Sequence, residues 1–177
     1  MHKAKKQDPT PRRLYFAYGA NTNLAAMHFR CPAARSLGAG NVDDFVLEFR
    51  LHADIVEREG ASVGGVLWSI TPQDERALDS FEGFPSYYVK RTVTVRTARG
   101  LAQAFVYVMA DTVERGLARP SADYWNLLRD GYRQNGVDDL QLHLALGRAR
   151  AASLINVVRK THELEQLWLE FGDEVAS

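Results

Sequence analysis

The chain reads Leu14-Tyr-Phe-Ala-Tyr-Gly-Ala-Asn21 near its start, an aromatic run that ends in a glycine-containing loop. Aromatic residues favour a strand over residues 14–18, and Gly and Asn readily adopt the positive φ angles of a tight turn. Residues 23–29 contain good helix formers, with Asn and Thr available in front of them as caps. This stretch therefore predicts a strand, a loop with several unpaired backbone N–H groups, and a helix.

The rest of the chain divides into a strand-rich middle and a helical end. Alternating or β-branched runs predict strands over residues 42–51, 61–70, 87–97 and 102–109. Thr71 and Pro72 are typical of a helix start, and they predict a helix over residues 71–81. Helical spacing of apolar residues continues over 121–133 and from 137 to about 171. The order of elements predicts an α+β fold whose mixed or antiparallel sheet curls into a small barrel with flanking helices.

The length of 177 residues is typical of one domain with one core. Residues 1–12 carry prolines and cations without an apolar pattern, which indicates a flexible lead-in, and the main domain is expected over 13–147. Residues 148–177 form an expected helical extension of the same domain. Its apolar positions must be covered by the domain or by a second subunit, so a homodimer is one expected outcome. The apolar positions of this extension are Leu154, Val157, Leu164, Leu167 and Trp168.

Charge and cysteine content exclude several classes of function. The chain has 22 Lys and Arg against 22 Asp and Glu, so no net basic field favours nucleic acid. No apolar stretch has the length of a membrane span, and the N-terminal residues lack the pattern of a secretory signal, so we expect a cytoplasmic protein. Cys31 is the only cysteine, which favours core packing over a disulfide or a cysteine-built zinc site. The histidines lack the short spacings of a metal site, so no metal is expected; they include His28, His52, His143 and His162.

The candidate catalytic residue is Glu82, which lies among aromatic residues in the segment Leu78-Asp-Ser-Phe-Glu-Gly-Phe84. A carboxyl group in such surroundings loses hydration, and its pKa should rise toward the range of a useful general base. A solvated Glu at a helix end is the alternative interpretation of the same residue. Asp79 is the rival carboxylate, but its place one turn earlier favours a surface or helix-terminal role.

Together the two segments resemble the gamma-glutamylcyclotransferase family, whose signature combines a Tyr-Gly-Ser-Asn loop on the first strand with a Leu-Asp-x-x-Glu-Gly segment some sixty residues later. The chain has Tyr18-Gly-Ala-Asn21 and Leu78-Asp-Ser-Phe-Glu-Gly83 in these places. The resemblance spans about residues 13 to 146 and continues through Gly64-Gly-Val-Leu-Trp68, Ala104-Phe-Val-Tyr107 and Pro120-Ser-Ala-Asp-Tyr124. Ala20 replaces the usual Ser, and residues 148–177 lie beyond the matching part.

The resemblance implies an enzyme without a metal or organic cofactor that converts a gamma-glutamyl amino acid, peptide or amine to 5-oxoproline and the free amine. The α-amine of the substrate would attack its own γ-carbonyl, with Glu82 as general acid and base. The N–H groups of Gly19, Ala20 and Asn21 would bind the substrate carboxylate or the oxyanion, with Tyr18 and Tyr88 as walls or donors. Two alternatives share the fold: a small-molecule binding or regulatory protein without turnover, and an enzyme of the same chemistry with a biosynthetic substrate.

Overall fold

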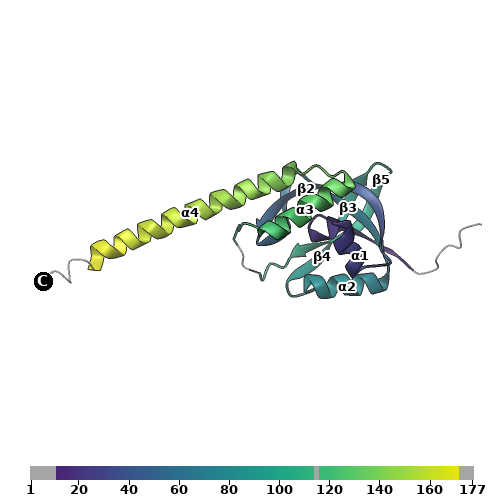
Figure 1. Cartoon of the computed structure of the whole chain (residues 1–177), viewed down its shortest axis with the longest axis horizontal. Coiled ribbons are helices and arrows are strands. Elements are labelled where there is room, and N and C mark those ends of the chain that lie inside the picture. Colours follow the sequence, from purple (N-terminus) through teal and green to yellow (C-terminus); the bar gives the residue numbers. More distant parts are fainter. Residues whose placement is uncertain (1–10, 114–115, 172–177) are drawn as a thin grey trace, which may run out of the picture.

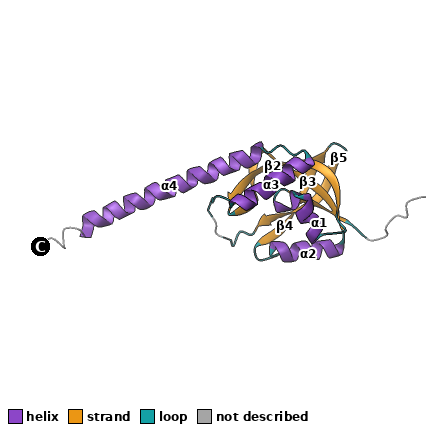
Figure 2. Cartoon of the chain, in the orientation of Figure 1, coloured by secondary structure: helices purple, strands orange, loops and turns teal. Residues whose placement is uncertain are grey.

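A small barrel and one long projecting helix make up the computed structural model, which describes residues 11–113 and 116–171, with side chains up to Glu163 (Figures 1 and 2). The strands are β1 (Arg13–Ala17), β2 (Arg35–Arg50), β3 (His52–Ile70), β4 (Tyr88–Thr97) and β5 (Gly100–Met109). The helices are α1 (Leu24–Arg30), α2 (Pro72–Glu82), α3 (Ala122–Asn135) and α4 (Leu140–Phe171), with a short 3₁₀ turn, η1 (Ala20–Thr22), before α1. The predicted α+β barrel with flanking helices is confirmed.

The five strands close into a barrel in the order β1-β3-β2-β4-β5. Antiparallel pairs form four of the five contacts, and β2 and β3 make one long hairpin that continues well past the predicted strands. The ring closes where β1 runs parallel to β5, with Tyr15 opposite Phe105. The first strand is therefore held on both sides, which fixes the position of the loop that follows it.

Alternation along β1 sends its side chains into two cores. Phe16 and Tyr18 pack inside the barrel against residues of α3 and α4, such as Leu128 and Leu142. Tyr15 and Ala17 face the opposite way, into a second core that lies beneath α1 and α2. The end of β1 is consequently the point where the two cores meet.

Local sequence explains both ends of α2. The Thr71 side chain accepts a hydrogen bond from the Asp74 N–H, and the Asp74 side chain accepts one from the Thr71 N–H, which completes a capping box. Gly83 follows the last helical residue with a φ of 64°, the left-handed conformation that favours glycine. The helix therefore ends at Glu82, and the chain turns sharply away beyond it.

Helix α3 packs closely against the loop that follows β1. A Cβ on Gly131 would lie 2.5 Å from the Thr22 Oγ1 and 2.6 Å from the Asn23 nitrogen, so only glycine allows this approach. Asn135 donates to the Thr22 carbonyl at 2.8 Å, and the Tyr132 hydroxyl donates to the Tyr18 carbonyl at 2.8 Å. The loop that contains Tyr18-Gly-Ala-Asn21 is thus held in place by contacts with α3.

Helix α4 packs on the barrel only through its first part. Leu142, Ala145 and Ala149 are fully buried, whereas Leu154 and Val157 are 67% and 63% exposed. Of the two covers that the sequence left open for these side chains, the domain does not cover Leu154 and Val157. Leu164, Leu167 and Trp168 lie outside the residues whose side chains are described.

The N-terminal lead-in is described only from Pro11 onward, and residues 1–10 lie outside the described part. Arg12 donates hydrogen bonds to the carbonyls of Ala33, at 3.1 Å, and Ser69, at 3.0 Å. Within residues 11–113 and 116–171, no helix combines the length and hydropathy needed to cross a bilayer.

Candidate active site

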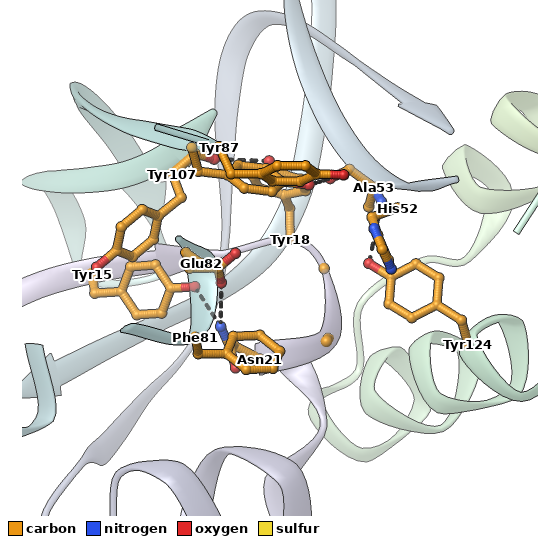
Figure 3. A pocket seen from close by; sticks show the side chains of 13 residues that line it. Tyr15, Tyr18, Asn21, His52, Ala53, Phe81, Glu82, Tyr87, Tyr107 and Tyr124 are labelled. Carbon is orange, nitrogen blue, oxygen red and sulfur yellow. Dashed lines mark hydrogen bonds between the residues drawn. The ribbon is translucent and has the colours of Figure 1, made fainter. Parts of the chain in front are cut away.

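A cavity of about 210 Å³ opens where β1 ends, between the loop after β1 and the end of α2 (Figure 3). All six residues that the sequence indicated line this cavity: Tyr18, Gly19, Ala20, Asn21, Glu82 and Tyr88. Seven further residues complete its lining: Tyr15, His52, Ala53, Phe81, Tyr87, Tyr107 and Tyr124. The cavity walls are mostly aromatic, and Glu82 is the only carboxylate among these lining residues.

Glu82 enters the cavity from the last turn of α2 and is anchored by Asn21 of η1. The Asn21 Nδ2 donates to the Glu82 Oε1 at 2.9 Å, which joins two segments 61 residues apart (Figure 3). Burial raises the pKa of Glu82 to about 7, against the lowering effects of the Arg30 charge and the Asn21 hydrogen bond. A carboxyl group with this pKa can both accept and release a proton near neutral pH.

Three hydrogen bonds orient the Asn21 side chain. Its Oδ1 accepts from the Arg30 Nη1 at 2.8 Å, while its Nδ2 donates both to the Tyr15 hydroxyl at 3.0 Å and to Glu82. Arg30 is itself held over the Phe81 ring, with its guanidinium carbon 3.6 Å from the ring centre. Because a cation cannot accept a hydrogen bond, Arg30 keeps the amide oxygen toward itself and the amide nitrogen toward Glu82.

Tyr18 and Tyr88 both use their hydroxyl hydrogens within the protein. Tyr18 donates to the Tyr107 carbonyl at 2.8 Å, and Tyr88 donates to the Ala53 carbonyl at 2.9 Å. Of the two roles that the sequence left open for them, the geometry favours walls over donors.

Tyr15 and Tyr124 are better placed as donors to a bound molecule. The Tyr15 hydroxyl accepts from Asn21, and the Tyr124 hydroxyl accepts from the Ala53 N–H at 3.2 Å. Within the described part of the chain neither hydroxyl hydrogen has an acceptor, so both are available to a ligand in the cavity. Sequence reasoning missed both roles, although Tyr15 adjoins the loop motif and Tyr124 closes the Pro120-to-Tyr124 segment.

The loop differs from the sequence expectation in its backbone angles. Gly19 has a φ of −106°, and none of Gly19, Ala20 and Asn21 has a positive φ, so the expectation of left-handed geometry there is wrong. A short 3₁₀ turn makes the bend instead, beginning with the Thr22 N–H donating to the Gly19 carbonyl at 3.0 Å. Among the described residues the N–H groups of Gly19 and Asn21 have no backbone acceptor.

Of the other residues that the sequence raised, Asp79 and Cys31 do not line the cavity, whereas His52 does. Asp79 accepts from the Tyr107 hydroxyl at 2.6 Å and pairs with Lys90 at 2.6 Å, so it holds the last turns of α2 against β4 and β5. Cys31 is buried in the second core, and desolvation raises its pKa to about 12, which keeps the thiol protonated. His52 lies at the cavity rim, packed edge-on against the Tyr124 ring. Among the residues that the structure describes, no group of three or more metal-binding side chains occurs.

Comparison with known proteins gives one consistent result. The family model described as gamma-glutamyl cyclotransferase, AIG2-like, matches residues 15–127. Gamma-glutamylcyclotransferase from Bos taurus is 31% identical over 140 residues, which cover 70% of this chain and 72% of the bovine one. The Homo sapiens protein of the same name is 31% identical over 137 residues, with the same coverages.

Solved structures agree with the sequence comparison. A structure named gamma-glutamyl cyclotransferase superposes with a TM-score of 0.68 at 29% identity, over 76% of this chain and 86% of the other. YkqA from Bacillus subtilis shares the fold, with a TM-score of 0.64 at 18% identity over 75% of this chain and 52% of its own.

Proposed function

Because the chain belongs to the gamma-glutamyl cyclotransferase, AIG2-like family and is a gamma-glutamylcyclotransferase-like enzyme, we propose that it converts a gamma-glutamyl amide to 5-oxoproline and the free amine with Glu82 as its general acid and base. The substrate is a gamma-glutamyl amino acid, peptide or amine. One observation carries this proposal: among the described residues, the only carboxylate that lines the cavity is Glu82, which has a pKa of about 7 and accepts a hydrogen bond from Asn21 in the turn after β1.

One carboxylate can carry out all the proton transfers of the reaction in turn. Glu82 takes a proton from the substrate α-ammonium, and the freed amine attacks the γ-carbonyl carbon to form the ring C–N bond. Protonated Glu82 gives its proton to the amide nitrogen, the original amide C–N bond breaks as the carbonyl re-forms, and the ionised Glu82 then takes the extra proton from the ring nitrogen. Passing that proton to the released amine returns Glu82 to its ionised form. The nucleophile belongs to the substrate, so the protein must fold the substrate into a near-attack conformation.

Hydrogen-bond donors around the cavity stabilise the negative charge on the carbonyl oxygen. The N–H groups of Gly19 and Asn21, which have no backbone acceptor among the described residues, come from a turn that packs on α3, and Tyr15 and Tyr124 add two hydroxyl donors. Donors that are fixed before the substrate arrives need no reorganisation in the transition state, which makes them effective. The aromatic walls exclude water and hold the hydrocarbon part of the gamma-glutamyl group.

We expect the purified protein to release 5-oxoproline from at least one member of a panel of gamma-glutamyl amino acids, peptides and amines. Mass spectrometry of the product measures this directly. Binding of a panel member without any 5-oxoproline would instead support the alternative, a non-catalytic small-molecule binding protein on the same fold.

The proposal also predicts a pH dependence that Arg30 controls. Since Glu82 must be ionised to accept the first proton, kcat/KM should rise with pH through about 7. The Arg30 charge lowers the pKa of Glu82, so Arg30→Gln should move this rising limb to higher pH. The control is Arg129→Gln, which removes a cation that pairs with Asp139 on the surface and should leave the profile in place. A profile that does not move in Arg30→Gln would contradict the role of Glu82 as the titrating base.

A further inference from the structure

Helix α4 leaves the barrel after its first turns and projects as a single rod (Figure 1). Arg148 donates to the Leu47 carbonyl and Ala149 is fully buried, so the part up to these residues belongs to the domain. Residues 154–171 continue for about 27 Å at 1.5 Å per residue. Leu154, Ile155, Val157 and Val158 are all 59–69% exposed.

Two of the four exposed apolar residues, Leu154 and Val157, begin a coiled-coil spacing. Leu154 and Val157 are three residues apart, and Thr161 follows four residues later. In the sequence the same alternation of three and four continues through Leu164, Trp168 and Phe171. A helix with such a seam is marginal in water on its own and becomes stable when a partner helix covers the seam.

The charges of this helix change sign halfway along it. Residues 148–160 contain four basic residues and no acidic one, namely Arg148, Arg150, Arg159 and Lys160. Residues 161–171 contain three acidic residues and no Lys or Arg, namely Glu163, Glu165 and Glu170. A chain that is neutral overall therefore carries a strongly polarised extension.

We propose that residues 154–171 form a dimer interface in which α4 pairs antiparallel with α4 of a second copy of this chain. In this arrangement the basic half of each helix lies beside the acidic half of its partner, and the two seams cover each other. A parallel pair would instead place basic beside basic and acidic beside acidic, which like-charge repulsion opposes. A two-fold axis crossing the helices near residues 162 and 163 satisfies both the charges and the three-four spacing.

The residues described as lining the cavity come mainly from the barrel strands, the turn after β1, α2 and α3, and none of them belongs to α4. The proposed dimer therefore does not depend on the proposed reaction. The mass of the protein in solution can be measured without measuring its activity, so the two proposals can fail separately. We expect the full-length protein to sediment as a dimer at micromolar concentration, and a chain truncated after Ser153 to sediment as a monomer. A monomeric full-length protein at about 100 µM, a concentration at which even weak specific complexes form, would overturn the proposal.

Charge-swap variants test the antiparallel direction. Arg159→Glu with Lys160→Glu leaves residues 154–171 with acidic side chains and no Lys or Arg, and the dimer should dissociate at least about tenfold more readily. Adding Glu163→Lys and Glu165→Lys inverts the polarity and restores attraction in an antiparallel pair, so this fourfold variant should dimerise within about threefold of the original chain. An unchanged dimer in the first variant, or no recovery in the fourfold variant, would contradict antiparallel pairing. Circular dichroism confirms that each variant is folded.

Discussion

Glu82→Gln is expected to fold normally and to lose about a hundredfold or more in kcat, since general acid–base catalysis typically contributes about 10² to 10⁴ in rate. Gln keeps the shape of the side chain, and its carbonyl oxygen can still accept the 2.9 Å hydrogen bond from Asn21. What it lacks is the ability to take and return a proton. Rates of 5-oxoproline release under saturating substrate measure the effect, and near-original turnover would remove Glu82 from the mechanism.

The same variant should gain stability, which separates a catalytic role from a structural one. The folded-state pKa of Glu82 is about 7, above its ordinary value of 4.5, so folding binds a proton between these two pH values. The contribution of Glu82 to stability is therefore present below about 4.5 and is lost as pH rises through 7, whereas Gln does not titrate. At pH 8 Glu82→Gln should melt above the original protein, and the gap should narrow as the pH falls. Asp79→Asn is the matched control for activity, because Asp79 lies in a framework contact with Tyr107 and Lys90 and should affect turnover much less.

Gly19→Val is expected to weaken substrate binding by about 5- to 150-fold, because filling a packed site costs about 1–3 kcal/mol. Gly19 lines the cavity, and a Cβ there already lies 3.4 Å from the Tyr124 hydroxyl and 3.6 Å from the Ala53 Cβ. The two further methyl groups of Val must then enter the cavity or displace Tyr124. Isothermal titration with a non-cleavable gamma-glutamyl analogue measures the loss.

Gly19→Ala provides the control for this prediction. Its single methyl group makes only ordinary van der Waals contacts, and the φ of −106° at this position lies outside the left-handed range that favours glycine. Affinity in Gly19→Ala should stay close to the original value, with thermal melts confirming that both variants fold. Equal affinity in Gly19→Val and the original chain would show that substrate does not contact this loop.

The sequence alone predicted those features of the site that are determined by residues close together in the chain. The aromatic run before Gly19 predicted β1, and Thr71 with Pro72 predicted the start of α2, because propensity and capping act within a few residues. Glu82 was singled out by the aromatic residues on both sides of it. The two motifs together indicated the family, which the comparison with known proteins establishes.

Only the tertiary structure decided which side chains face one another across the cavity. Barrel closure between β1 and β5, and the packing of Gly131 against Thr22, fix the loop over distances that no local pattern encodes. These contacts bring Asn21 to Glu82, and they assign Tyr15 and Tyr124, in place of Tyr18 and Tyr88, as the available donors. Arg30 lies on α1 with no motif to mark it, yet it orients Asn21 and lowers the pKa of Glu82. Local chemistry thus determined which groups this protein carries, whereas long-range packing determined their orientation, partners and pKa, because those depend on distances between segments far apart in the chain.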